Sequence, residues 1–204
     1  MHYIISDTHF GHENIKTYEP VRKDYDDERL VQLWNETITS EDEVLHLGDF
    51  AFKSNGWELA KRLNGNITLL KGNHDFKKGR NALREFGFVR IIESIDINLP
   101  NHARIVQALQ KEFSKELLKK CVCLVEQHNQ EVILFSHYPA FYEDPYDRSE
   151  EVVEIKNVLQ RVFDLSGCTC NYHGHIHSKR ASDSRCINVS VEHCGFKPIP
   201  LRWS

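Results

Sequence analysis

The stretch from Ser6 to His12 reads SDTHFGH and directly follows a short apolar run, Tyr3-Ile4-Ile5. Asp7 and His9 form a D-x-H pair, which can direct a carboxylate and an imidazole toward one metal ion. Short polar residues are also common in ordinary loops, so the pair by itself does not distinguish a metal site from a loop. The residues that follow the later apolar runs decide between these two interpretations.

The composition is that of an ordinary soluble protein. The chain has 204 residues, a formal net charge of -4 and 27% charged residues, and this length is enough for one packed domain over 1–204. No long basic block indicates bulk nucleic-acid binding. No run of about 18 apolar residues is present, and the start, Met1 to Ile5, is too short for a secretory signal. We therefore expect a cytoplasmic protein that does not bind membranes.

Apolar runs alternate with amphipathic stretches along the chain, which predicts an α/β or layered α+β fold built on a central sheet. Helical spacing of apolar residues predicts helices behind the acidic stretch 26–28, between about Gly56 and Leu63, and over 152–163. The runs that predict strands are Tyr3 to Ser6, Val44 to Leu47, Ile67 to Lys71, Val132 to Ser136, Cys170 to His173 and Ile187 to Ser190.

The segment at about 101–129 is predicted to be a helical insertion. Its apolar residues recur every three or four positions from Ala103 to about Gln127, with lysines and glutamates between them. This spacing is typical of one long amphipathic helix or of two shorter ones. Such a segment would cover the sheet, form a cap beside the active site, or contact a partner chain.

Potential metal ligands follow five of the six predicted strands. Ligand sites of open α/β sheets lie outside the carboxyl ends of the strands, so these five ends can meet at one crevice. A glycine precedes three of the ligands, and its missing side chain would permit a tight turn and a close approach there. The candidate ligands are Asp7, His9, Asp49, Asn73, His137, His175 and His177.

The types of these ligands indicate the metals and the reaction. Carboxylates, imidazoles and an amide oxygen, without thiolates, suit Mn, Fe, Co, Ni or Zn rather than a structural cysteine-rich zinc site. The set is too large for one ion that keeps an open position, and it suits two ions that share a carboxylate. Two such ions lie about 3.5–4 Å apart and clamp the attacking and leaving oxygens of an in-line displacement. Phosphoryl transfer is the reaction that this arrangement favours.

Five short blocks, D-T-H, G-D-F, G-N-H-D, S-H-Y-P and G-H-I-H, occur in this order along the chain. Together with the strings SDTHFGHENI and HLGDFAF, they resemble the calcineurin-like metallophosphoesterase superfamily, and within it a small bacterial and phage branch. The resemblance implies two packed β-sheets flanked by helices, with a dinuclear metal site at the carboxyl ends of strands. It implies one ion held by Asp7, His9, Asp49 and His177, and a second held by Asp49, Asn73, His137 and His175, with Asp49 bridging.

The resemblance also implies a mechanism. His74 matches the family's histidine that contacts the phosphate and protonates the leaving oxygen, and Asp75 would orient it. A hydroxide activated by two divalent ions would attack phosphorus in line. Mn is the metal we expect, with Fe, Zn, Ni and Co as alternatives. The expected substrate is a small nucleotide-like phosphodiester or phosphomonoester, whose phosphate His12, Lys179 and Arg180 would help to hold.

Two other functions remain open from the sequence. A nuclease acting on DNA or RNA ends would use the same chemistry, and its substrate binding would depend strongly on salt. A non-catalytic protein-binding scaffold of the same fold, as in the retromer coat, tolerates the loss of ligands and of the catalytic histidine. This chain has every ligand and His74, which favours an enzyme.

Overall fold

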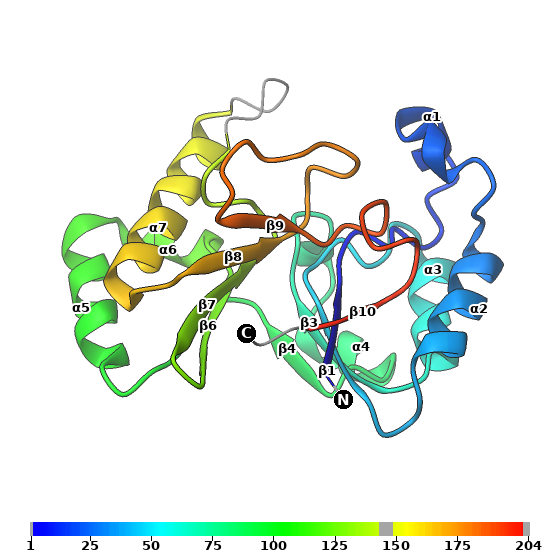
Figure 1. Cartoon of the computed structure of the whole chain (residues 1–204), viewed down its shortest axis with the longest axis horizontal. Coiled ribbons are helices and arrows are strands. Elements are labelled where there is room, and N and C mark those ends of the chain that lie inside the picture. Colours follow the sequence, from blue (N-terminus) through cyan, green and yellow to red (C-terminus); the bar gives the residue numbers. More distant parts are fainter. Residues whose placement is uncertain (1, 143–148, 202–204) are drawn as a thin grey trace.

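The computed structural model describes residues 2–142 and 149–201, and its strands form two five-stranded sheets (Figure 1). The first sheet has the order β10-β1-β2-β3-β4 and is parallel except for β10; the second has the order β5-β6-β7-β8-β9 and is parallel except for the β6–β7 pair. The strands are β1 His2–Ile5, β2 Glu43–His46, β3 Asn66–Leu70, β4 Arg90–Ile92, β5 Ile95–Asn98, β6 Cys123–His128, β7 Glu131–Ser136, β8 Cys170–His173, β9 Cys186–Asn188 and β10 Ile199–Pro200.

Both faces of the first sheet are buried beyond the exposed first residue of β1, β2, β3 and β4, which explains why most of the following positions are apolar. Ile4 of β1 belongs to the core between the two sheets, together with Phe135 of β7. The next residue, Ile5, belongs to a second core with Trp34, under the helices. Because neighbouring residues of a strand point to opposite faces, a strand covered on both sides needs apolar residues at every position.

Helices cover the outer face of each sheet (Figure 1). Helices α2, α3 and α4 pack on the first sheet, and α5, α6 and α7 pack on the second. Among the described residues, no helix combines the length and the apolar character that crossing a bilayer requires. The helices are α1 Ile15–Tyr18, α2 Asp27–Thr37, α3 Ser54–Glu58, α4 Arg80–Glu85, α5 His102–Glu112, α6 Lys115–Lys120 and α7 Glu150–Ser166, with short 3-10 turns at Pro20–Arg22, Leu59–Arg62 and Asp75–Lys77.

The segment at 101–129 differs from the helix predicted up to about Gln127, because its last part is strand β6. The hydroxyl of Ser114 accepts the backbone N–H of Leu117 and caps α6, so the helical part is divided into α5 and α6. In β6, Leu124 lies in the core between the sheets and Val125 lies in the core under the helices. That alternation has a period of two, but over so few residues it also fits helical spacing. Strands β4, β5 and β10 are also absent from the prediction, and each is four residues or shorter.

Candidate metal centre

The loops that follow β1, β2, β3, β7 and β8 meet at one edge of the two sheets. The backbone N–H of Asp7, after β1, donates to Gly48 O at 3.0 Å, after β2. Nδ1 of His137, after β7, donates to Leu47 O at 2.9 Å and so joins the second sheet to the first. The N–H of His175, after β8, donates to Oδ2 of Asp7 at 3.0 Å. The predicted convergence of five strand ends is therefore present in the fold.

The structure brings all seven candidate ligands into one cluster. One group of three with ligand atoms within 4.8 Å of one another is Asp7, His9 and His177, and another is Asp7, Asp49 and His137. The two remaining candidates adjoin these groups through His137. Its Nε2 lies 2.8 Å from Asn73 Oδ1, and its ring centroid lies 5.2 Å from that of His175.

Lone-pair atoms in this cluster face one another, which is the arrangement that a cation satisfies. Nε2 of His9 lies 3.6 Å from Oδ2 of Asp49 and 3.8 Å from Oδ1 of Asp7. Oδ1 of Asp7 and both ring nitrogens of His9 are buried and have no hydrogen-bond partner among the described residues. A buried polar atom without a partner costs free energy, and a bound ion removes that cost. The residues therefore fit a divalent cation at this point.

A second set of acceptors converges on His137. Because Nδ1 of His137 donates to a carbonyl, Nε2 is the nitrogen that carries the lone pair once the ring has lost its second proton. That nitrogen faces Oδ1 of Asn73 at 2.8 Å and Oδ2 of Asp49 at 3.4 Å. Three acceptors around one point again fit a cation, and Asp49 Oδ2 is common to both sets. This position is the one that a bridging carboxylate would take between two ions.

The backbone at the candidate ligands is in an unusual conformation. Five of the seven have positive φ angles: Asp7 at 59°, His9 at 50°, Asp49 at 53°, His175 at 71° and His177 at 49°. Residues with a side chain rarely adopt this left-handed region, and such strain is concentrated at functional sites. The five residues lie in the three loops after β1, β2 and β8, and in these loops the placement of the side chains outweighs the preference of the backbone.

Two of the glycines before candidate ligands are required by close approach. A Cβ on Gly72 would lie 2.3 Å from Oδ1 of Asp49, and a Cβ on Gly174 would lie 2.3 Å from Oδ2 of Asp7. Both distances are far inside van der Waals contact. The two glycines thus permit the carboxylates of the first sheet to lie directly against the loops after β3 and β8.

The charges in the cluster suit metal binding at neutral pH. Burial lowers the pKa of His9 to about 3 and that of His175 to about 4, so both rings are neutral. Burial alone would raise the pKa of Asp7, but the nearby imidazoles, His137 first, lower it to about 2. Burial alone would lower the pKa of His137, but the Asp49 carboxylate raises it to about 9. Ionised carboxylates and neutral imidazoles are the forms that bind metals, and the proton on His137 is one that a bound cation would displace.

His74 lies at the rim of the cluster. Its side chain is 42% exposed, and its Nε2 is 3.8 Å from Oδ2 of Asp49. The backbone N–H of His74 donates to Oδ1 of Asp49 at 3.0 Å, which holds this residue beside the carboxylate. The imidazole is thus open to solvent on one side and faces the candidate metal site on the other.

Asp75 has a different environment from the one we expected. Its carboxylate is buried and accepts the N–H groups of Gly72 at 2.9 Å, Asp49 at 2.8 Å and Phe50 at 3.2 Å. These hydrogen bonds join the loops after β2 and β3, and they do not run to the His74 ring. Asp75 therefore positions the backbone of Asp49 and Gly72 rather than orienting His74.

Arg22 and Glu192 are buried polar residues that the sequence patterns did not reveal. Nη1 of Arg22 donates to Thr8 O at 3.2 Å, and Nη2 donates to Asp7 O at 2.6 Å. Nε of Arg22 donates to Oε1 of Glu192 at 2.7 Å, and the same oxygen accepts Nδ1–H of His177 at 3.1 Å. A carboxylate that holds one ring nitrogen leaves the other nitrogen aimed at the metal. No short motif contains Arg22 or Glu192, and the one signal in the sequence was an acid beside the apolar residues 189 and 191.

Of the three predicted substrate contacts, His12 lies beside the cluster, and Lys179 and Arg180 follow His177 in the loop after β8. The His12 ring lies 5.6 Å from that of His9 and stacks on Phe52. The backbone carbonyl of Lys179 accepts side-chain N–H groups of Asn188 at 2.9 Å and His193 at 3.0 Å, which fixes the loop after His177. Arg180 is exposed in that loop.

The fold and the cluster define a class: a two-sheet α/β protein with Asp and His side chains that could hold metal ions at the carboxyl ends of its strands. Residues 1–191 match the family described as the calcineurin-like phosphoesterase superfamily domain, and the chain belongs to this superfamily. The resemblance that the five blocks carry is thereby confirmed, together with the fold of two sheets flanked by helices.

Individual relatives have been found in archaea and bacteria. A stretch of 85 residues is 39% identical to the uncharacterized protein MJ1445 of Methanocaldococcus jannaschii, over 36% of this chain and 46% of that protein, so the match spans about half of the relative. The crystal structure of AQ665 from Aquifex aeolicus, a protein of unknown function, shares 28% identity with a TM-score of 0.71 over 98% of this chain and 94% of that one. A novel archaeal phosphodiesterase shares 15% identity with a TM-score of 0.43 over 93% and 81%.

Proposed function

We propose that this protein is a cytoplasmic, metal-dependent phosphoesterase that hydrolyses a small nucleotide-like phosphodiester or phosphomonoester. One observation carries the proposal: a single carboxylate oxygen, Oδ2 of Asp49, lies 3.4 to 3.8 Å from imidazole nitrogens of His9, His74 and His137. Two of these imidazoles belong to the buried candidate ligand set and the third is exposed. The arrangement provides ion binding and proton donation within one small site.

Two divalent ions, Mn²⁺ in the first instance, would supply an activated water and neutralise the charge of the phosphoryl group. The first candidate set, Asp7, His9, Asp49 and the partly exposed His177, would hold one ion. The second set, Asp49, Asn73, His137 and His175, would hold the other. The cluster excludes bulk solvent on its inner side because Asp7, His9, Asp49 and His137 are each no more than 3% exposed.

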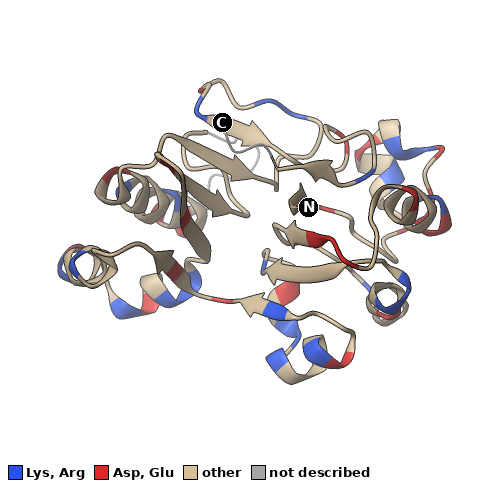
Figure 2. Cartoon of the chain, turned by 60° about the horizontal axis from the view of Figure 1, so that its bottom comes forward, with Lys and Arg blue, Asp and Glu red and all other residues tan. Residues whose placement is uncertain are grey.

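His74 would complete the reaction by donating a proton to the leaving oxygen. Its backbone is tied to Asp49 while its ring is open to the side from which substrate arrives. General acid catalysis of this kind typically contributes about 10² to 10⁴-fold to a rate. Lysine, arginine and acidic residues alternate along the helices (Figure 2), which supports a small substrate over a long nucleic acid.

The experiment that tests this proposal is hydrolysis by the purified protein with Mn²⁺ and with the other divalent ions. The substrates are bis-p-nitrophenyl phosphate, p-nitrophenyl phosphate and a panel of nucleotides, with elemental analysis of the same preparation. We expect about two metal ions per chain and turnover of at least one ester. Bound metal without turnover of any ester would leave a metal-binding protein and contradict the enzymatic function.

A further inference from the structure

An exposed aromatic ring lies beside His74, and the proposed function does not yet use it. Phe52 follows β2 and is 48% exposed, although one face of its ring stacks on His12 with centroids 4.2 Å apart and planes at 23°. A single exposed apolar side chain is common on protein surfaces. The location of the Phe52 ring and the contacts that hold it distinguish it from such a side chain.

The backbone under Phe52 is fixed from two sides. Its N–H donates to Phe10 O at 2.9 Å, beside the bridge that pairs Phe10 with Ala51. Gly56 packs on the same carbonyl so closely that a Cβ there would lie 2.1 Å from the oxygen. The exposed ring is thus held by the junction of the loops after β1 and β2, the loops that carry Asp7, His9 and Asp49.

Phe52 and His74 are in contact. Their ring centroids lie 5.6 Å apart with planes at 63°, and Nε2 of His74 lies 3.8 Å from Oδ2 of Asp49. In the proposed function, His74 gives its proton to the leaving oxygen. The group bonded to that oxygen then lies on the outer side of His74, next to the open part of the Phe52 ring.

We propose that Phe52, backed by His12, is the stacking surface for the base of a nucleoside leaving group, whose sugar oxygen accepts the proton of His74. This inference rests on the proposed function, because it takes His74 as the acid. Every base has an aromatic face, so stacking gives a preference for nucleosides over plain sugars without strong selection among bases. His12 supports this surface and keeps the Phe52 ring from turning toward the protein.

The test compares the competitive inhibition constants of adenosine 5′-monophosphate and ribose 5-phosphate, which differ by the base. Both are measured against Mn²⁺-dependent hydrolysis of bis-p-nitrophenyl phosphate. In the wild type we expect the nucleotide to bind more tightly by roughly 5- to 160-fold, the range for one stacked base. Phe52→Leu should bring this ratio close to one, and Phe52→Tyr should preserve most of it.

The matched control is Phe76→Leu, the same change at a ring that is 47% exposed but lies by the ammonium of Lys71, 5.9 Å from its centroid. This variant should keep the wild-type ratio. A ratio that survives Phe52→Leu while the diester is still hydrolysed would overturn the stacking surface and leave the proposed function intact. Failure of the wild type to hydrolyse the diester or any other ester, with any divalent ion, would overturn the proposed function and this inference with it.

Discussion

Arg22 and Glu192 form a buried ion pair between residues 170 positions apart, with Nη2 of Arg22 2.6 Å from Oε1 of Glu192. Both side chains are at most 2% exposed. Through this pair, the carbonyl of Asp7 and the ring of His177 are held in one network. The loop after β1, which carries Asp7, and the loop after β8, which carries His177, are thereby fixed relative to each other.

We predict that Glu192→Gln lowers the affinity for Mn²⁺ by about 10- to 100-fold, the usual effect of losing a partner behind a metal-binding histidine. The neutral amide holds Nδ1–H of His177 less firmly, and it leaves the buried charge of Arg22 uncompensated. Calorimetric titration with Mn²⁺ measures the affinity, and thermal unfolding shows whether the variant is folded. The control is Glu28→Gln, which breaks an exposed pair with Arg62. Equal affinity in Glu192→Gln and wild type would refute the role of Glu192.

His74→Asn should keep both metal ions and lose about 10² to 10⁴-fold of turnover, because it removes the proton donor and no buried ligand. Elemental analysis and hydrolysis of bis-p-nitrophenyl phosphate on the same preparation separate these two effects. Turnover at the wild-type rate would remove His74 from the role of acid. Loss of metal would instead make it a ligand.

Asp49→Asn should lose bound metal, whereas His74→Asn should keep the metal and lose turnover. The substitution removes the negative charge that Oδ2 presents to His9, His74 and His137. Two cations that share one carboxylate depend on that charge. We expect fewer than two ions per chain by elemental analysis at Mn²⁺ concentrations that saturate the wild type. Full occupancy in this variant would show that Asp49 does not bridge.

Gly174→Ala should disturb the site by a steric clash, without changing any charge or ligand. Its Cβ would lie 2.1 Å from Oγ of Ser6 and 2.3 Å from Oδ2 of Asp7, so the Asp7 carboxylate must move. Such overpacking typically costs about 1–3 kcal/mol of stability. We expect a lower melting temperature and weaker Mn²⁺ binding. Gly79→Ala is the control, because a Cβ there meets no atom within 4 Å; similar losses in both variants would contradict the prediction.

The part of the site that lies next to strand ends could be predicted from the sequence. Asp7, Asp49 and Asn73 lie two or three positions after the last residue of an apolar run, and the parallel order of β1, β2 and β3 brings the ends of those runs together. The candidate ligands of the second sheet were predictable for the same reason, because they follow β7 and β8. Short sequence blocks are enough to predict these ligands, because a strand places the few residues that follow it at the carboxyl edge of the sheet.

The residues beneath the site could not be predicted in this way. Arg22 and Glu192 meet through the fold, and neither follows a strand that carries a ligand. The role of Asp75 depends on how the loop turns after Gly72, since its carboxylate binds backbone N–H groups rather than the neighbouring ring. At the edges of the sheets, β4 and β10 are too short to show a period, and the alternation of β6 is masked by the two helices before it.

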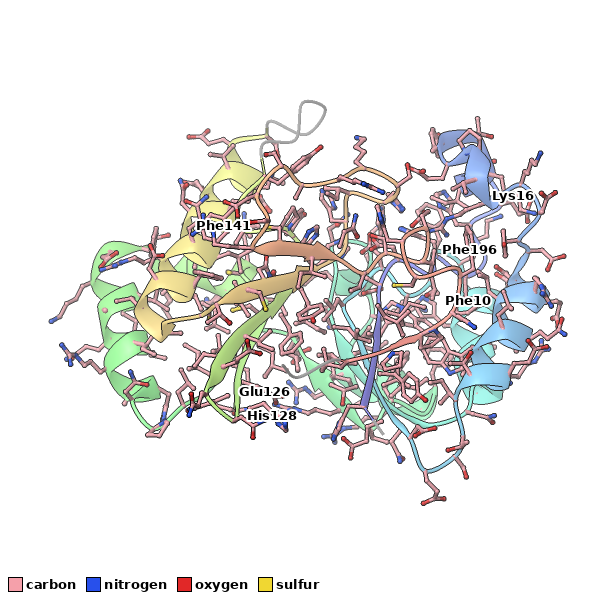
Figure 3. The ribbon with its side chains drawn as sticks, in the orientation of Figure 1. Phe10, Lys16, Glu126, His128, Phe141 and Phe196 are labelled. Atoms are coloured by element: carbon pink, nitrogen blue, oxygen red, sulfur yellow. The ribbon has the colours of Figure 1, made fainter. Side chains whose placement is uncertain are left out.

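A cavity lies at the end of the sheets opposite to the candidate metal centre. A cavity of about 410 Å³ is lined by His2 and Glu43 at the start of the first sheet and by Glu126 and His128 of β6. Figure 3 labels Glu126 and His128, which lie at the lower end of the second sheet. The candidate ligands follow the other ends of β1 and β2, so this cavity plays no part in the proposed chemistry.

His46, at the end of β2, makes the stability of the fold depend on pH. Its Nδ1 accepts the N–H of Gly48 at 3.1 Å, so Nε2 carries the hydrogen and donates to Oγ1 of Thr8 at 3.0 Å. The Thr8 hydroxyl in turn donates to Phe50 O at 2.8 Å. Burial lowers the pKa of His46 from 6.5 to about 3, so the ring is neutral in the folded protein at and below neutral pH.

Between these two pKa values the unfolded chain binds a proton at His46 that the folded protein does not bind. Stability from this residue is therefore complete above about pH 6.5 and is lost progressively as the pH falls toward 3. At pH 5 the loss is about 2 kcal/mol. His46→Gln should be less stable than wild type at pH 7.5, yet its urea-unfolding free energy should fall about 2 kcal/mol less between pH 7.5 and pH 5. His128→Gln, at an exposed position, should keep the wild-type decline, and the same decline in His46→Gln would rule out His46 as its source.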